Sequence, residues 1–348
     1  MLKWWRALPK AVRQPVTLVV KAAVTLAVFY LLLRHEIVTS DGVRQPMWQA
    51  LRDQLGQVEL SSLLPFLLVA ALLKFVGIFA SMLRWQLLLI GQGIRFNLWH
   101  IVGSFLIGRF LWTFLPSTVG LDGYKLYDAA RFSGKVIEPA AATAVEKVTG
   151  IVGLLVIFVL TLPLGYRVLG THAGTVALAT VPAAVLLVGL VLFLLFRPGP
   201  IERLLAMIPW GQGRAQNFAA RVSHAAAAYR GRGRLLVAVV LLSLAVHFCT
   251  AAMYYFTALG IGAHGARFWD ITFASSIQIV ATVLSPTMAG EGVRELVQAF
   301  LLQNLIGTSA AVLSAALGFW AAEALTLFGA VFLWTRPASY RPRQCEVS

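Results

Sequence analysis

Two short motifs in the sequence share one chemical pattern: an acid, a glycine, a variable residue and a base. They are Asp122-Gly123-Tyr124-Lys125 and Glu291-Gly292-Val293-Arg294. Glycine lets the backbone turn tightly and lets a ligand approach it closely. A helix that begins just after such a motif offers free N–H groups and a positive dipole end, to which the base adds a full charge. The motifs therefore predict a receptor for an anionic phosphate headgroup.

Other charged side chains lie inside or at the ends of apolar runs, where an unpaired charge is costly. These further candidates for the same substrate-binding site are Lys74, Arg84, Arg109, Glu146 and Glu323. The acids are expected to pair with the bases or to carry protons during a transport cycle. The alternative is that acids and bases only neutralise each other and fix the local structure.

Several classes of chemistry lack their sequence signatures. Cys249 and Cys345 stand alone, and His247 has no neighbouring ligand at metal-binding spacing. No GxSxG or GxxxxGKS/T motif is present. We therefore assign no catalytic residue, no metal and no cofactor from the sequence.

The elements that position these residues are predicted to be membrane helices. The 348 residues are 59% hydrophobic and 12% charged, against roughly 25% charged in soluble domains. This composition predicts an all-α polytopic membrane protein. The net charge of +15 would suit nucleic-acid binding in a soluble chain. Here the bases cluster between apolar runs, so positive-inside topology explains them and no nucleic-acid partner is expected.

Both motifs interrupt apolar runs with proline and glycine, and broken backbone survives in a membrane only inside protein or a wet cavity. All basic clusters fall on the cytoplasmic side if 98–135 enters and leaves from the cytoplasm and 269–305 does so from outside. Besides these two oppositely oriented re-entrant hairpins, we predict six full spans: 16–33, 63–90, 140–164, 174–196, 235–259 and 310–334. Both termini are then cytoplasmic. Residues 47–60 are predicted to form an amphipathic surface helix.

The two halves of the chain resemble each other. Trp99 and Trp269 are 170 residues apart, and the two motifs are 169 apart. We predict a single transmembrane domain over 16–335, with repeat 1 at about 63–164, repeat 2 at about 235–334 and a basic cytoplasmic loop at 197–234. Residues 1–15 form a basic cytoplasmic N-terminus, and 336–348 form a cytoplasmic tail. Inverted repeats with broken helices are typical of transporters.

Four stretches carry a family resemblance. They are Arg84-Trp85, LPSTVGLDGYKLYDAARFSGK, the segment Val145–Gly150 and SPTMAGEGVRE. Together they resemble the transmembrane, flippase-type domain of lysylphosphatidylglycerol synthases, over roughly 15–335. The resemblance implies lipid translocation without the synthase domain, so synthase activity is not expected.

The sequence therefore predicts a multi-pass protein of the bacterial inner membrane. It would move an anionic phospholipid or polyprenyl-type lipid between leaflets, with Lys125 and Arg294 holding the headgroup. Two alternatives stay open: an enzyme that modifies lipid within the membrane, and an accessory subunit of a lipid-modifying system. The oligomeric state, a homo-oligomer included, is also left open.

Overall fold

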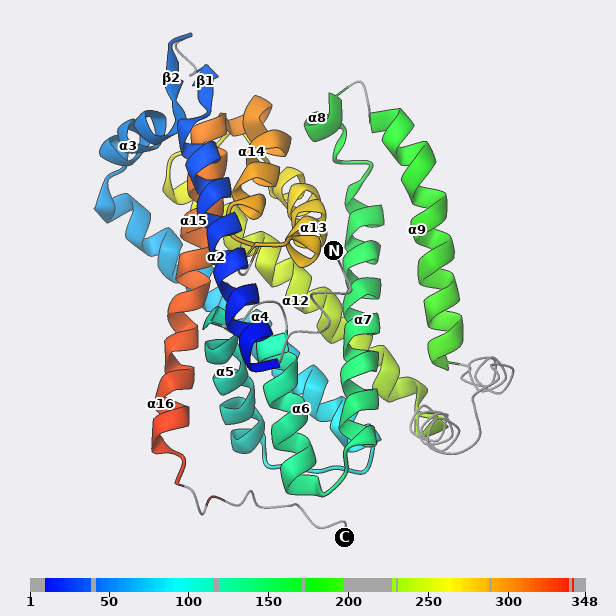
Figure 1. Ribbon diagram of the computed structural model, residues 1–348. Coiled ribbons are helices and arrows are strands. Elements are labelled where there is room, and N and C mark those ends of the chain that lie inside the picture. The colour runs from blue at the N-terminus through cyan, green and yellow to red at the C-terminus, as the bar shows by residue number, and fades with distance from the viewer. Residues whose placement is uncertain are drawn as a thin grey trace.

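The computed structural model describes residues 10–38, 42–114, 119–170, 173–196, 227–229, 231–287, 290–337 and 340. Nearly all of this structure is helical (Figure 1). The helices are α2 (Lys10–Arg34), α3 (Met47–Gln57), α4 (Leu60–Gly91), α5 (Leu98–Phe114), α6 (Val119–Ser133), α7 (Ile137–Thr161), α8 (Tyr166–Leu169), α9 (Ala173–Phe196), α12 (Gly233–Gly260), α13 (Phe268–Leu284), α14 (Val293–Ile306), α15 (Thr308–Ala324), the 3-10 turn η3 (Leu325–Leu327) and α16 (Phe328–Thr335). The predicted all-α class is confirmed.

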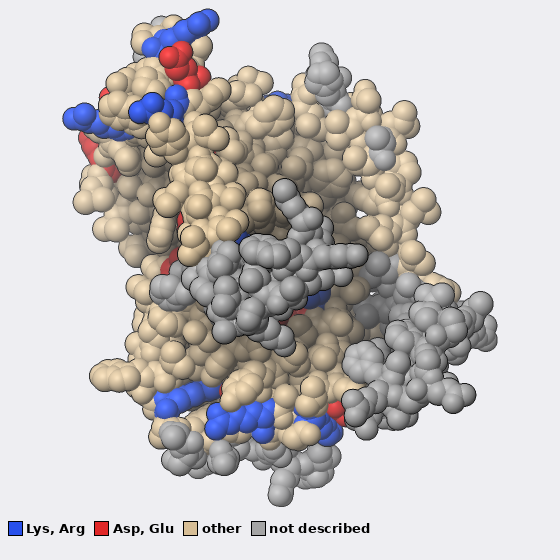
Figure 2. All heavy atoms as spheres, in the orientation of Figure 1, with Lys and Arg blue, Asp and Glu red and all other residues tan. Residues whose placement is uncertain are grey.

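Four described helices are long and apolar enough to cross a membrane. They are α4, α7, α12 and the continuous run Thr308–Thr335 formed by α15, η3 and α16. In Figure 2 most visible charged side chains lie at the two ends of the molecule, with a broad band of other residues between them. The chain is a multi-pass membrane protein. The full count of six spans remains a prediction.

A small feature of the polar segment 34–60 was not predicted. Strands β1 (Glu36–Val38) and β2 (Arg44–Pro46) pair antiparallel ahead of α3. Gly42 in the connection has a φ of 77°, which favours glycine and allows the chain to reverse. The predicted surface helix at 47–60 is present as α3, with Trp48 and Leu55 exposed.

Helices α4 and α12 cross and pack closely along much of their length (Figure 1). Small residues allow this approach, as is common between membrane helices. A Cβ on Gly77 of α4 would lie 3.1 Å from Cβ of Cys249, and one on Gly260 of α12 would lie 2.9 Å from Cβ of Phe66. Helix α7 joins them, because Gly153 packs against Ser243. These three helices form the frame that holds the buried charges.

Two antiparallel helix pairs, α5–α6 and α13–α14, pack against this frame. The outer ends of α5–α6 lie near the lower end of the molecule in Figure 1, and those of α13–α14 lie near the upper end. In the first pair, Nε2 of His100 lies 3.0 Å from Oδ2 of Asp128. At the ends of the second, a Cβ on Gly265 would overlap the backbone of Leu305. In each pair, the start of the first helix and the end of the second therefore lie close together.

The lower end of the frame is closed by Tyr229. Its ring lies against Gly91, and its hydroxyl donates a hydrogen bond of 2.9 Å to the carbonyl of Leu88. Burial raises the pKa of Tyr229 to about 12. The ring thus fastens the segment before α12 to the end of α4.

The pKa of Tyr229 predicts a loss of stability at high pH. The folded state holds this proton more tightly than the unfolded state, whose tyrosine pKa is about 10. The stabilisation is therefore complete below pH 10 and is lost as the pH rises towards 12. Tyr229→Phe should remove this dependence and cost about 1 kcal/mol at neutral pH, because the hydrogen bond to the carbonyl of Leu88 is lost. Thermal unfolding in detergent at pH 8 to 11.5 measures both effects. An unchanged pH profile in the variant would contradict the assignment.

Candidate functional site

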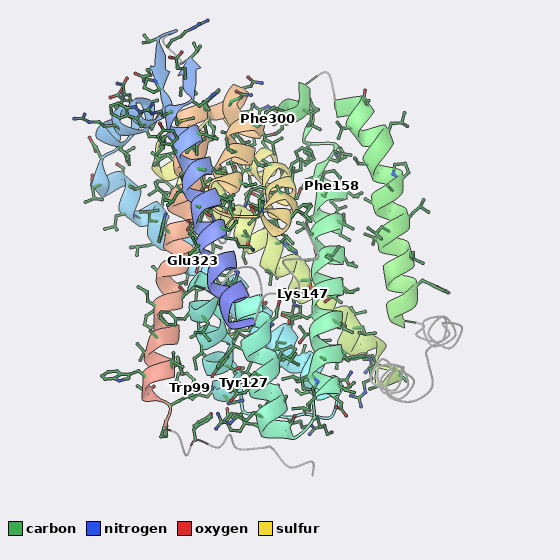
Figure 3. All side chains as sticks on the ribbon, in the orientation of Figure 1. Trp99, Tyr127, Lys147, Phe158, Phe300 and Glu323 are labelled. Carbon is green, nitrogen blue, oxygen red and sulfur yellow. The ribbon has the colours of Figure 1, made fainter. Side chains whose placement is uncertain are left out.

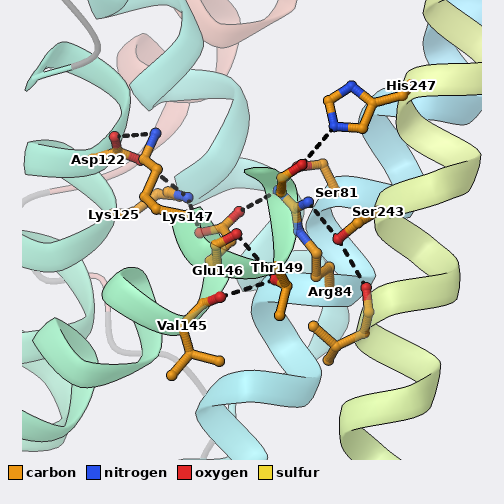
Figure 4. A network of polar contacts seen from close by, with 12 residues as sticks. Ser81, Arg84, Asp122, Lys125, Val145, Glu146, Lys147, Thr149, Ser243 and His247 are labelled. Atoms are coloured by element: carbon orange, nitrogen blue, oxygen red, sulfur yellow. Dashed lines mark hydrogen bonds and ion pairs between the residues drawn. The ribbon is translucent and has the colours of Figure 1, made fainter. Parts of the chain in front are cut away.

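The first charge cluster joins α4, α6 and α7 and consists of Arg84, Asp122, Lys125, Glu146 and Lys147 (Figure 4). Nζ of Lys125 lies 2.7 Å from Oε2 of Glu146, whose Oε1 lies 3.2 Å from Nη2 of Arg84. Asp122 lies 3.5 Å from Lys125 and 2.6 Å from Nζ of Lys147. Arg84 also donates a hydrogen bond of 2.9 Å to Ser243 on α12. The cluster therefore ties the first helix pair to the frame.

Within this cluster, Lys125 is buried against aromatic rings. The side chain of Lys125 is 1% exposed, and its Nζ lies 4.7 Å from the ring centre of Trp85 and 5.0 Å from that of Phe105. Three bases face two acids, so the cluster carries a formal surplus of one positive charge. Lys147 is 47% exposed and can turn towards an incoming group. A surplus cation within a membrane protein is costly alone and is well suited to an anion.

The second charge cluster joins α4, α5, α14 and α15, with the turn before α14. Its members are Lys74, Arg109, Glu291, Arg294, Glu295 and Glu323. Figure 3 places Glu323 at mid-height, like Lys147 of the first cluster, between Phe300 near the upper end and Trp99 near the lower end. Both clusters thus occupy the middle of the molecule.

Within the second cluster, Arg294 is paired with its neighbour Glu295. Its Nε and Nη2 lie 3.0 and 2.5 Å from Oε1 of Glu295. Oε2 of Glu295 accepts a hydrogen bond of 2.7 Å from the N–H of Gly292, whose φ of 81° requires glycine. The guanidinium lies 3.7 Å from the ring centre of Phe319. Glu291 of the motif acts on Arg294 through its charge, while the hydrogen bonds of Arg294 go to Glu295.

The remaining members connect the two helix pairs. Nη2 of Arg109, on the first pair, lies 2.8 Å from Oε1 of Glu323 on α15. The charges of Arg109, Glu323 and Arg294 all act on Lys74, whose Nζ donates a hydrogen bond of 3.4 Å to Thr250. The charge of Glu323 also acts on Glu291. Glu323 therefore lies within electrostatic range of both motif-bearing helix pairs.

The two motifs differ in their local structure. Helix α14 begins at Val293, directly after Gly292, so its first N–H groups are available near the second motif. Helix α6 begins at Val119, so Asp122 and Gly123 already lie within its first turns. At the first motif, the free N–H groups of the helix start therefore belong to residues that come before Asp122 in the chain. The breaking residue Pro116 and most of the basic loop 197–234 lie outside the described residues.

The structure adds two pairs that the sequence reasoning missed. Nη1 of Arg167, on α8, lies 2.7 Å from Oδ2 of Asp270 at the start of α13. Nη1 of Arg336, just after α16, lies 3.2 Å from Oδ1 of Asp128 on α6. We call these the upper latch and the lower latch. One signal was available: Arg167 and Arg336 are 169 residues apart, the spacing of the two motifs.

His247 is hydrogen-bonded rather than grouped with other ligands. Its Nε2 lies 2.9 Å from the carbonyl oxygen of Gly150. Across the described parts of the chain, no three His, Cys, Asp or Glu residues lie close enough together to hold a metal ion.

Comparison with known proteins adds the family. The model of the lysylphosphatidylglycerol synthase TM region matches residues 5–330. No curated protein gives a significant match to the chain. The match covers both charge clusters, both motifs, the upper latch and Asp128 of the lower latch, and it ends before Arg336. The chain belongs to the family of the lysylphosphatidylglycerol synthase transmembrane region.

Proposed function

We propose that this protein moves an anionic, phosphate-bearing lipid between the two leaflets of the membrane. The observation that carries the proposal is the first charge cluster, in which a surplus positive charge is held within the membrane-spanning frame beside a broken helix pair. Lysine and arginine are suited to bind a phosphate group by charge-assisted hydrogen bonds. The family is also one of lipid metabolism. The headgroup would enter beside Lys125 and Lys147 and then meet Arg109, Arg294 and Lys74.

The proposed topology has six spans and two re-entrant hairpins. The spans are α2, α4, α7, α9, α12 and the run α15–α16; the hairpins are α5–α6 and α13–α14. The proposal is supported by the ends of each helix pair lying together, at opposite ends of the molecule (Figure 1). With the positive-inside rule, the lower end is cytoplasmic, because Arg95, Arg131 and Lys135 lie there. Both termini are then cytoplasmic, in a bacterial inner membrane.

The latches support an inverted repeat with two gates. Arg167 follows the span after the first hairpin but holds the second hairpin, through Asp270. Arg336 follows the span after the second hairpin but holds the first, through Asp128. Each repeat thus fastens the hairpin of the other, one near the upper end and one near the lower end. A transporter that opens to alternate sides needs a releasable contact of this kind at each end.

A leaflet-accessibility assay tests the function. Purified protein is placed in vesicles with fluorescently labelled phosphatidylglycerol, and a membrane-impermeant quencher reports lipid in the outer leaflet. We expect rapid translocation that protein-free vesicles lack. Lys147→Ala should slow it about tenfold, since a charged hydrogen bond is worth roughly 1.5–3 kcal/mol. Lys135→Ala, which removes an exposed lysine, is the matched control. Equal rates in K147A and K135A would refute the role of the first cluster.

A further inference from the structure

The two buried glutamates Glu146, on α7, and Glu323, on α15, are bonded differently. Both carboxylate oxygens of Glu146 are engaged, one by Arg84 and one by Lys125. Glu323 uses only Oε1, which accepts from Arg109. Its Oε2 is buried and has no hydrogen-bond partner among the described residues. A buried carboxylate oxygen without a donor is costly. A proton on this oxygen would neutralise the carboxylate and so reduce this cost.

The charges that act on Glu323 come from several elements. Arg109 lies on α5, Lys74 on α4, and Glu291, Arg294 and Glu295 lie on and before α14. Tyr254 of α12 also lies within range. With all of these acids ionised, three bases face three acids and the second cluster is neutral.

A neutral cluster cannot accept an anion without compensation. A headgroup phosphate that binds Arg109, Arg294 or Lys74 adds at least one negative charge. In a low-dielectric site such an uncompensated charge is strongly unfavourable. Uptake of one proton per negative charge restores neutrality. Among the acids, Glu295 is held by two contacts from Arg294 and one from the N–H of Gly292. Glu291 is only partly buried, so water can solvate its charge. Of the two buried acids, Glu323 is held by one contact only, so it is the one freer to give up its charge.

We propose that lipid translocation by this protein is coupled to protons, and that Glu323 is the residue that takes up the proton when the headgroup enters the second cluster. This inference rests on the proposed lipid transport and adds its energy source. When the phosphate displaces Glu323 from Arg109, the carboxylate binds one proton and becomes a neutral acid. When the lipid leaves, the proton leaves and the pair with Arg109 reforms. Lipid and proton therefore move in the same direction.

This coupling makes a thermodynamic prediction for a lipid of charge −1. With one proton per lipid, a pH difference of one unit should give a leaflet ratio of about 10 at steady state, with the lipid enriched on the alkaline side. The transported pair is neutral, so an imposed membrane potential should not change this ratio. Labelled phosphatidylglycerol in vesicles with an imposed pH gradient is the probe. Glu323→Gln fixes the neutral form and should bring the ratio to about 1 while translocation continues.

The matched control is Glu59→Gln, because Glu59 is exposed and makes no side-chain cap to α4. It should behave as the wild type does. Translocation by the wild type with a ratio near 1 would overturn the proton coupling and leave lipid transport intact. Absence of translocation by the wild type would overturn the proposed function itself. A ratio near 10 in E323Q would show that another group carries the proton.

A binding measurement gives an independent readout if E323Q transports poorly. Short-chain dihexanoyl phosphatidylglycerol is added to protein in detergent at neutral pH under weak buffering, and the pH change is recorded. The wild type and E59Q should take up about one proton per bound lipid, because the phosphodiester is already fully ionised. E323Q should bind the lipid without proton uptake. Equal uptake in E323Q and the wild type would refute the role of Glu323.

Discussion

Arg294→Ala is expected to lower the free energy of unfolding by about 3–5 kcal/mol, because it leaves Glu295 charged and unpaired in the protein interior. Glu295 is 1% exposed and receives two contacts from Arg294. The substitution also removes the cation that packs on Phe319. Thermal unfolding in detergent measures the loss. Arg44→Ala, which removes an exposed arginine of β2, is the matched control. If R294A were as stable as R44A, the Arg294–Glu295 pair would not contribute to stability as we expect.

The double variant R294M/E295Q separates stability from transport. It removes both charges together, and such a replacement of a buried pair is often neutral for stability. The glutamine can still accept the hydrogen bond from the N–H of Gly292. We therefore expect near-normal unfolding, together with translocation of labelled phosphatidylglycerol at least about tenfold slower, since a charged contact to the headgroup is lost. Normal translocation in this variant would mean that Arg294 serves only the fold.

Asp270→Asn is expected to open the upper end of the protein. It removes the negative charge that lies 2.7 Å from Nη1 of Arg167. The amide oxygen can still accept the hydrogen bond from the N–H of Arg267 that the carboxylate accepts. A charged hydrogen bond of this kind is worth roughly 1.5–3 kcal/mol, or about 10–100-fold in an opening equilibrium. Asp128→Asn should have the same effect at the lower end, because it weakens the contact to Arg336 together with the contact to His100 inside the first helix pair.

Cysteine labelling reads out both latches in a background where Cys249 and Cys345 are replaced by serine. Thr287→Cys reports near the tip of the second hairpin, and Ser104→Cys reports on α5; both positions are buried. We expect D270N to raise labelling of T287C by a water-soluble maleimide about tenfold or more and to leave S104C unchanged. D128N should do the reverse. Equal effects of both variants on both probes would indicate general loosening rather than two separate gates.

If both latches act as proposed, each step of a transport cycle can be assigned to a part of the chain. The first cluster would receive the headgroup, the second would exchange Glu323 for it, and the latches would decide which end is open. The family match gives the lipid setting, while the cycle is argued from the charges of this chain. The two clusters differ in one respect that supports this division. The first has a surplus positive charge, and the second is balanced.

The sequence alone determined the membrane class, the helical fold and the positions of most long helices. The predicted spans at 235–259 and 310–334 correspond to Gly233–Gly260 and Thr308–Thr335. These features are local, because an apolar run of about 20 residues must form a helix in lipid. The breaks were also local, since proline and glycine mark them directly. The amphipathic spacing likewise gave α3 to within a few residues.

The tertiary structure decided which charges meet. The sequence indicated that acids would pair with these bases but not which acid would pair with which base: the shortest contact of Lys125 is with Glu146 and that of Arg294 is with Glu295. Arg84, Glu146 and Ser243 are far apart in the chain and meet only because α4, α7 and α12 pack through glycine. The latches, in which an arginine from one half of the chain pairs with an aspartate from the other half, depend in the same way on helix packing. Ion pairs depend on distances between helices, and helix spacing is set by side-chain packing along the whole interface rather than by any single motif.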